Sequence, residues 1–324
     1  MTKATLDILG IGNAIVDVLA RADDEFVMTR GLAKGSMALI DAEQAEALYG
    51  AMGPGVESSG GSVANSCAVA AGLGARVGYL GKVARDGLGD VFAHDIRAAG
   101  VHFPTAPLEG GAPTARCLIL VTPDAQRTMS TFLGACVHFS AADVDLAEVA
   151  RAQVVYLEGY LFSGAQDAFR AAAAAAHAAG RKVALSLSDG FCVDMNRDAF
   201  RHFVREHTDI LFANEPEILS LDQTTDFAQA ADQARSEVAI AALTRGAHGS
   251  VVVAGPDSHQ IKAASTQVVD TTGAGDAYAA GFLAAHTRGL GLAEAGRWGS
   301  ICAAEVISHF GARPQADLRA LVGA

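Results

Sequence analysis

Short apolar runs alternate with longer alanine-rich stretches along most of this chain. The runs are bounded by turn residues, which is typical of strands that are buried on both faces of a parallel sheet. The expected strands are 77–80, 154–157, 183–187, 210–212, 239–243 and 250–253, and the clearest helical stretches between them are 165–179 and 227–235. The alternation predicts an α/β fold, a doubly wound, mostly parallel sheet with helices on both faces.

Two regions, residues 13–40 and 101–133, interrupt this alternation. They contain short strand-like segments separated by glycine, proline and polar turns, and no long helix is expected between their strands. We expect them to pair into a small β-sheet that projects from the core as a lid. Because no repeat or low-complexity linker separates the two regions from the rest, residues 1–324 are predicted to form a single domain with two lid insertions.

Composition narrows the classes of partner. A net charge of −12 without a dense basic run disfavours nucleic acid and anionic membranes. No apolar run approaches the roughly 20 residues that a membrane helix needs, and the N-terminus lacks a signal-peptide pattern, so we expect a cytoplasmic protein. The 5 cysteines include no Cys-x-x-Cys pair and the histidines no ligand-like cluster, so buried thiols and no structural metal are expected.

The sequence from Asp270 to Tyr278, Asp-Thr-Thr-Gly-Ala-Gly-Asp-Ala-Tyr, is the strongest candidate for chemistry. It follows the β-branched pair Val268 and Val269, turns on two glycines and begins an alanine-rich helix. A strand that leads through such a turn into a helix presents unpaired N–H groups and a positive dipole end, which suits a phosphate. Asp276 would be repelled by that anion, so we interpret it as the acceptor of a substrate hydroxyl proton, with helix capping as the alternative. The pairing indicates phosphoryl transfer to an alcohol.

A second group of residues suits a polyhydroxylated acceptor. Gly60 and Gly61 allow close approach of the backbone to a ligand, and Asn65 lies four residues farther on, in the first turn of a small-residue helix. Asp17 is a carboxylate in an otherwise apolar stretch, and vicinal sugar hydroxyls would supply two donors to it. A plain loop with a helix cap, and a turn cap at Asp17, are the alternatives.

These motifs, in this order, resemble the two signatures of the ribokinase-like (PfkB) family of sugar and nucleoside kinases, and the resemblance covers nearly the whole chain. It implies an ATP-dependent phosphotransferase that uses Mg²⁺. By this resemblance Gly273, Ala274 and Gly275 form the anion hole, and Asp276 is the catalytic base. An intact Gly-Ala-Gly-Asp sequence argues against a non-catalytic homologue.

The resemblance also implies a nucleotide-binding half. Asn214 and Glu217 match an Asn-x-x-Glu motif, which arranges Mg²⁺ through water; an ordinary helix cap is the alternative. Thr244, Gly246 and Gly249 match a nucleotide-binding turn, and a hairpin turn would also explain them.

Further positions are implied at the phosphates and the base. Arg127 resembles a lid arginine that reaches the transferring phosphate, although an exposed turn arginine is the alternative. The adenine of ATP is expected against residues 302–311, which include Ala303 and Ile307. Asp270 and Thr272 resemble residues near a monovalent cation site, so K⁺ is a candidate ligand.

The acceptor is predicted to be adenosine. Ribokinases usually carry a lysine after the two glycines, where this chain has Ser62. The run that contains Asn13 and Asp17, together with Gln126-Arg127-Thr128, looks more like adenosine kinases, which implies conversion of adenosine to AMP in purine salvage. Candidates for an aromatic purine slot, each of which also suits the core, are Tyr160, Phe162, Phe132 and Phe103. A sugar kinase of the same family is the alternative, and both a monomer and a homodimer fit the sequence.

Overall fold

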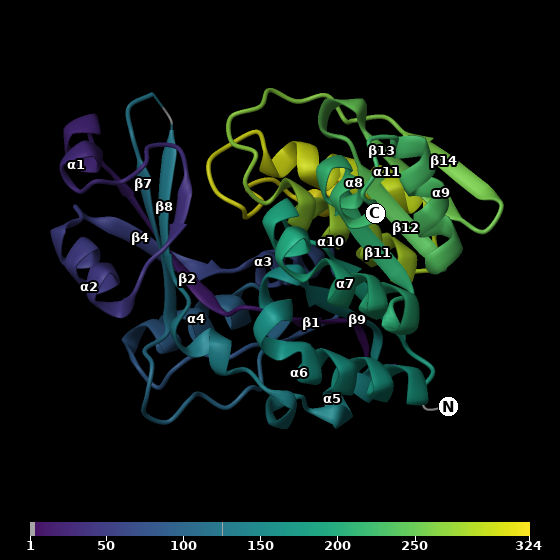
Figure 1. The fold of residues 1–324 in the computed structure, drawn as a ribbon, viewed down its shortest axis with the longest axis horizontal. Helices are drawn as coiled ribbons and strands as arrows, with labels where there is room; N and C mark the ends of the chain where they lie inside the picture. The colour runs from purple at the N-terminus through teal and green to yellow at the C-terminus, as the bar shows by residue number, and fades with distance from the viewer. Residues whose placement is uncertain (1–3, 125) are drawn as a thin grey trace.

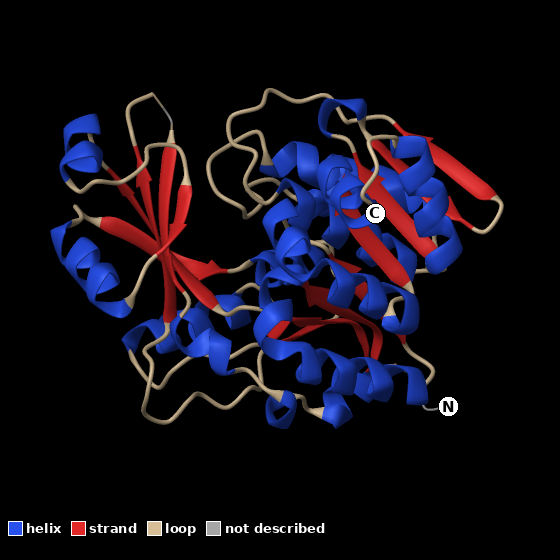
Figure 2. Ribbon diagram, viewed as in Figure 1, coloured by secondary structure: helices blue, strands red, loops and turns tan. Residues whose placement is uncertain are grey.

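The computed structural model describes residues 4–124 and 126–324, and it contains a large and a small β-sheet (Figures 1 and 2). The large sheet has the strand order β14-β13-β12-β11-β10-β9-β1-β5-β6. Its strands are β1 (Leu6–Ile11), β5 (Val77–Leu80), β6 (Val101–His102), β9 (Ala152–Glu158), β10 (Lys182–Ser186), β11 (Ile210–Asn214), β12 (Ile240–Thr244), β13 (Ser250–Ala254) and β14 (Asp257–Ile261). The strands from β6 to β12 are parallel, and β13 and β14 add an antiparallel edge. All six strands expected from the apolar runs are present.

Helices cover both faces of this sheet, which confirms the predicted fold class. One core contains α3 (Ser62–Gly72), α4 (Gly87–Ala98), α10 (Ala274–Thr287), α11 (Leu292–Val306) and α12 (Leu318–Val322). The other contains α5 (Leu146–Arg151), α6 (Gly159–Ala178), α7 (Gly190–His207), α8 (Glu215–Asp222) and α9 (Phe227–Glu237). Short 3₁₀ turns are η1 (Gly134–His138), η2 (Ala141–Asp143) and η3 (Gly246–His248).

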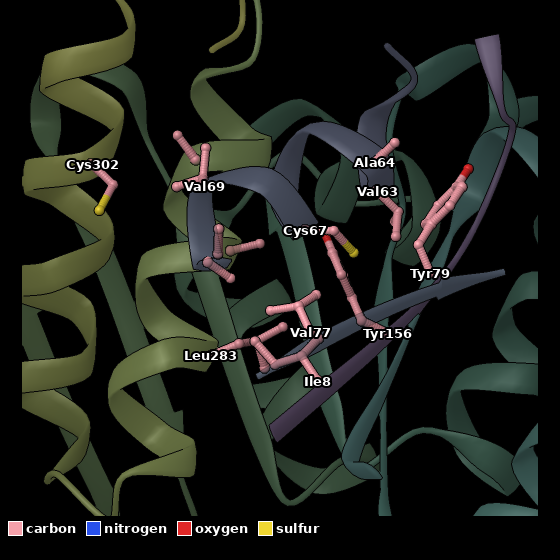
Figure 3. Close-up of a cluster of buried hydrophobic side chains, with 14 of the residues drawn as sticks. Ile8, Val63, Ala64, Cys67, Val69, Val77, Tyr79, Tyr156, Leu283 and Cys302 are labelled. Atoms are coloured by element: carbon pink, nitrogen blue, oxygen red, sulfur yellow. The ribbon is translucent and has the colours of Figure 1, made fainter. Parts of the chain in front are cut away.

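Alternation along β1 places side chains in both cores. Ile8 faces the α3 side, and Leu9 faces the α6 side. Figure 3 shows Ile8 near Leu283 of α10, below Cys67 of α3. A side chain at Gly10 would lie 2.4 Å from the Cys67 sulfur, so this glycine lets α3 pack directly on β1. The close packing fixes the N-terminus of α3 above the end of β1.

The small sheet stands beside the core and has the order β3-β8-β7-β2-β4 (Figure 1, purple to teal). Its elements are β2 (Ile15–Arg21), β3 (Met37–Leu39), β4 (Gly55–Gly60), β7 (Ala115–Val121), β8 (Arg127–Phe132), α1 (Asp24–Thr29) and α2 (Ala42–Ala51). The expected regions 13–40 and 101–133 contain four of these strands. They omit β4 and α2, and β6 within the second region belongs to the large sheet instead.

The segment before α10 differs from expectation. No strand forms at Val268 and Val269, which lie in a loop and are 58% and 39% exposed. The Val269 amide donates instead to the carbonyl of Ile307, just after α11, over 2.8 Å, and none of the described strands pairs with this loop. Among the described residues, no helix is long and apolar enough to cross a membrane.

Candidate active site

The expected functional residues gather where parallel strands end and the small sheet begins. Asn13 lies in the short connection between β1 and β2, Asn214 is the last residue of β11, and Thr244 is the last residue of β12. Asn214 and Thr244 are register partners. Ligands of open α/β sheets bind at this carboxyl edge, so topology alone brings the two expected halves of the site together.

Asp276 lies in the first turn of α10 and is held by α3. Ser62 Oγ donates to Asp276 Oδ1 over 2.6 Å, and Asn65 Nδ2 donates to Oδ2 over 3.4 Å. Ser66 Oγ donates to the Asp276 carbonyl over 2.9 Å. Desolvation raises the pKa of Asp276 to about 6, although Ser62 and Asn65 stabilise the charged form and oppose the rise. A carboxylate with this pKa is ionised at neutral pH and basic enough to accept a proton.

Residues 270–275, which lead into α10 and which we call the anion turn, have the geometry of an anion site. Gly273 is the N-cap residue with φ 76°, a left-handed conformation that favours glycine. A Cβ at Gly275 would meet no other atom within 4 Å, so the space beside this first helical turn is open. The first N–H groups of a helix have no partner within it, so the Gly275 amide is suited to an anion. The Ala274 amide donates to the Thr271 carbonyl of the same turn over 3.2 Å.

Gly60 and Gly61, which we call the acceptor turn, bring Asp17 and Asn13 close to the start of α3. A Cβ at Gly60 would lie 2.3 Å from Asp17 Oδ2, and one at Gly61 would lie 2.1 Å from the Asn13 carbonyl oxygen. Gly61 also has φ 96°. Only glycines fit both positions, because atoms of Asp17 and Asn13 occupy the space of a side chain. Approach of a ligand to this turn stays a prediction.

The pKa of Asp17 depends on charges from several parts of the site. Desolvation raises the pKa of Asp17 to about 6, Arg313 and Arg127 lower it, and Asp276 raises it. Asp17 and Asp276 therefore influence each other across one site, although they come from opposite ends of the chain.

Glu158 is a buried carboxylate that the sequence analysis missed. It ends β9 with no exposed surface, and it accepts hydrogen bonds from the amides of Asn13 over 2.8 Å and Val63 over 3.0 Å. Desolvation raises its pKa to about 7. Its signal in the sequence was a lone acid after the apolar run Val154-Val155-Tyr156-Leu157. Glu158 ties the β1–β2 connection to the start of α3.

On the nucleotide side, Asn214 caps α8, so the helix-cap interpretation is correct as far as structure goes. The Asn214 side chain accepts from the Glu217 amide over 2.9 Å, and Glu217 Oε2 accepts from the Asn214 amide over 2.9 Å. Glu217 is 5% exposed, and desolvation raises its pKa to about 7. Its oxygens already bind donors but keep free lone pairs, which fits contact with a metal-bound water rather than direct ligation.

The Thr244 turn is a hairpin next to this motif. Gly246 lies in η3, and Gly249 adopts φ 82° before β13 begins. Arg245 binds Glu215 with an Nη2–Oε1 distance of 2.9 Å, which joins the hairpin to α8. The hairpin alternative therefore describes the local structure, and the turn lies at the carboxyl end of β12.

Arg127 is not an exposed turn arginine. Its Nη1 lies 2.6 Å from Asp270 Oδ2, and the two side chains are 8% and 7% exposed. Asp270 also accepts from the amides of Thr272 over 3.0 Å and Gly311 over 3.1 Å. With a guanidinium and two amides around the carboxylate, this donor set does not fit the expected K⁺ at Asp270 and Thr272.

The remaining candidates divide between site and core. Ala303 and Ile307 are half-buried near the end of α11, and the Ile307 carbonyl accepts from the Asp270 amide over 3.3 Å. Phe103 and Phe162 are core residues, 3% and 1% exposed. Tyr160 is 40% exposed in the first turn of α6, where its ring lies 6.1 Å from that of Phe191. Phe132 is half-buried in β8.

Comparisons with known proteins agree with this geometry. Residues 28–318 match the pfkB family of carbohydrate kinases. The structure superposes on an adenosine kinase from Sinorhizobium meliloti with a TM-score of 0.90 and 50% identity, over 98% of each chain. It superposes on a probable sugar kinase from Rhizobium etli with a TM-score of 0.91 and 44% identity, over 99% of this chain and 98% of the other. The adenosine kinase of Saccharomyces cerevisiae is 27% identical over 91% of this chain and 93% of its own length.

The chain belongs to the pfkB family of carbohydrate kinases, and it is a phosphotransferase.

Proposed function

We propose that this kinase transfers the γ-phosphoryl group of ATP to the 5′-hydroxyl of adenosine and releases AMP and ADP. The proposal rests most on one observation: Asp276, held by Ser62 at the anion turn, shares a site with Asp17 across the acceptor turn. The 50% identity to an adenosine kinase supports adenosine as the acceptor. If so, the reaction recovers a purine nucleoside, and its need for ATP favours the cytoplasm.

Each residue at the acceptor side has a distinct task in this mechanism. Asp17 accepts hydrogen bonds from the 2′- and 3′-hydroxyls of the ribose, and Asn13 and Asn65 supply further polar contacts. The 5′-hydroxyl then lies near Asp276, which takes its proton as the hydroxyl oxygen attacks phosphorus. The Ser62 hydroxyl keeps the Asp276 carboxylate oriented towards α3 until the acceptor arrives.

The nucleotide side stabilises the transferred group. The turn of Gly273, Ala274 and Gly275, through the Gly275 N–H and the positive end of α10, faces the negative charge that spreads over the phosphoryl oxygens. Arg127 adds a fixed cation from the small sheet, which we interpret as a lid over the site. Thr244, Gly246, Gly249, Ala303 and Ile307 line the side proposed for the nucleotide. Mg²⁺, when bound, would neutralise phosphate charge, with Asn214 and Glu217 holding its waters.

An aromatic pair offers a place for the purine of the acceptor. Tyr160 and Phe191 are both about two-fifths exposed, at 40% and 42%, and their rings lie 6.1 Å apart. Desolvation, with the Asp189 and Asp276 charges after it, raises the pKa of the Tyr160 phenol, so this ring lies within electrostatic reach of Asp276. A partly exposed aromatic surface within electrostatic reach of the proposed base Asp276 favours a nucleoside over a free sugar.

A sugar acceptor is the second candidate, because the Rhizobium etli relative is a probable sugar kinase. The decisive experiment measures ADP release from ATP and Mg²⁺ with a panel of nucleosides and sugars. Adenosine should give a kcat/KM at least about 100-fold above every sugar tested, and AMP should form in equal amount to ADP. A sugar with the highest kcat/KM, and no AMP from adenosine, would refute the adenosine assignment.

A further inference from the structure

Three consecutive residues after α11 each contact a different part of the site. The Gly311 amide donates to Asp270 Oδ2 over 3.1 Å. Ala312 packs against Gly273, where an added Cβ would lie 2.7 Å from the Ala312 Cβ. Arg313 Nη2 donates to the carbonyl of Ser59 over 2.7 Å and to its Oγ over 2.9 Å. A single short loop therefore joins the anion turn to the strand that leads into the acceptor turn.

Ser59 is clamped from two sides. It is 1% exposed, lies opposite Val16 in the β2–β4 pairing, and directly precedes Gly60. Its amide donates to Asp95 Oδ2 of α4 over 2.8 Å, and its Oγ donates to the same oxygen over 2.5 Å. Arg313 binds the carbonyl and Oγ of the same residue. Gly60 follows Ser59 in β4, and Asp17 follows Val16, the residue opposite Ser59 in β2. A shift of Ser59 would therefore move Gly60 relative to Asp17.

Arg313 has a guanidinium without a carboxylate partner of its own. No described carboxylate lies within ion-pair distance of it, and its buried Nε has no hydrogen-bond partner in the described part of the chain. Burial lowers the pKa of Arg313, and attraction to Asp95, Asp17 and Asp276 offsets this only in part, so holding a charged arginine here is costly. Its contacts with Ser59 are therefore the geometric reason to look for a functional role.

The Arg313 charge also acts on the acceptor carboxylates. It opposes the desolvation that raises the pKa of Asp17 and of Asp276. The ionisable groups that face Arg313 are Asp95 of α4, Asp17 of β2, Cys67 of α3 and Asp276 of α10, and Arg127 of β8 also faces Asp17. Arg313 and Arg127 favour the ionised form of Asp17, and Arg313 favours the ionised form of Asp276.

We propose that Arg313 is a positioning residue for phosphoryl transfer, which fixes the acceptor turn through Ser59 and joins it to the anion turn. It acts through Ser59 and through its charge, and it does not contact the substrate. The inference rests on the phosphotransferase activity, but it does not require adenosine as the acceptor.

The test compares Arg313→Gln, Arg313→Lys and Ser59→Ala, with whichever acceptor the wild type uses best. Arg313→Gln should raise the acceptor KM about tenfold and leave the ATP KM within about twofold. It should also move the acid limb of kcat/KM upward by roughly 0.5–1.5 pH units, whereas Arg313→Lys should keep that limb near its wild-type pH. Arg288→Gln is the matched control, because Arg288 donates to the Leu73 carbonyl away from the site. It should change neither KM nor the acid limb.

A double-mutant cycle tests the route through Ser59. Ser59→Ala should raise the acceptor KM without moving the acid limb, and its effect should be largely absent in the Arg313→Gln background. Additive effects, an unchanged acid limb in Arg313→Gln, or equal changes in both KM values would overturn the proposal. If Arg313→Gln does not fold, an unchanged acceptor KM in Ser59→Ala would overturn it alone. A sugar as best acceptor would refute the adenosine assignment only.

Discussion

Arg127 of β8 and Asp270 before α10 form an ion pair of 2.6 Å that is almost completely shielded from solvent. It joins the small sheet directly to the anion turn, and two backbone amides complete the contacts of Asp270. The pair therefore couples the position of the small sheet to the part of the site that holds phosphate.

Removing only one partner of this pair should destabilise the fold. Asp270→Asn leaves the Arg127 charge buried without compensation, so we expect a loss of about 3–5 kcal/mol in the free energy of unfolding, measured in urea. Arg127→Met combined with Asp270→Asn should recover at least half of that loss. A double variant as unstable as the sum of the single changes would mean that the pair does not couple the two segments.

Asp276→Asn should abolish turnover while preserving binding. The change removes the proton acceptor but keeps the shape of the side chain, so kcat should fall about 10²–10⁴-fold while ATP and acceptor affinities stay within several-fold. Because desolvation raises the pKa of Asp276 to about 6, wild-type kcat/KM should also decline below about pH 6.

Single-turnover rates and calorimetric binding separate these effects. Asp226→Asn is the control, since Asp226 likewise lies at the start of a helix, as the N-cap of α9, but is exposed and comes from a different part of the fold. Activity of Asp276→Asn within about tenfold of the wild type would remove Asp276 as the base.

The same carboxylate should weaken the fold at neutral pH. The pKa of Asp276 rises from its ordinary 3.8 to about 6 on folding, so between these pH values the folded chain keeps a proton that the unfolded chain has lost. This contribution to stability is complete below about pH 4 and is lost as the pH rises through about 6. Asp276→Asn should therefore be about 3 kcal/mol more stable than the wild type at pH 7.5, and the difference should nearly vanish near pH 4. Urea denaturation at both pH values checks this, and a destabilised variant at pH 7.5 would contradict it.

Asp17→Asn should impair acceptor use far more than ATP use. Replacing the carboxylate weakens charged hydrogen bonds to the acceptor, so kcat/KM for the acceptor should fall by about 1.5–3 kcal/mol, or roughly 10–150-fold. Glu57→Gln is a control in β4 of the same sheet, where the carboxylate binds the Tyr49 hydroxyl instead. A raised ATP KM with an unchanged acceptor KM would show that Asp17 belongs to the other half of the site.

Local sequence patterns predicted six of the nine strands of the large sheet, and they did not predict the whole small sheet. Apolar runs such as 154–157 mark strands because both of their faces are buried, and that signal is contained within the run. β4, Gly-Val-Glu-Ser-Ser-Gly, has no such signal and is a strand because it pairs with β2. Val268 and Val269 show the converse: β-branched residues favour strands, but no strand lies beside them to pair with.

The candidate site was predictable where spacing defines the chemistry. The glycines and Asp276 belong to one continuous segment, as do Asn214 and Glu217. In the sequence Ser62 marks only a departure from ribokinases, but in the structure it donates a hydrogen bond to Asp276, which is 214 positions away. Glu158 and Arg313 were missed for the same reason, because their partners are brought near only by the fold.

The small sheet should close over the site when both substrates bind. Arg127 is already adjacent to the anion turn through Asp270, and Asp17 and Gly60 lie where the small sheet meets the core, so acceptor and phosphate would bridge the two sheets. Closure would exclude water that otherwise hydrolyses ATP. Hydrogen exchange with adenosine and a non-hydrolysable ATP analogue should therefore show slower exchange in residues 13–40 and 101–133, and in β4, with α9 unchanged as an internal reference. Equal exchange in these segments, in a sample shown to bind both ligands, would mean that the site is preformed.

Arg127→Ala should lower kcat about 10³-fold, since a cation that neutralises charge on a transferring phosphoryl group is worth at least that much. A loss below about tenfold would remove Arg127 from catalysis.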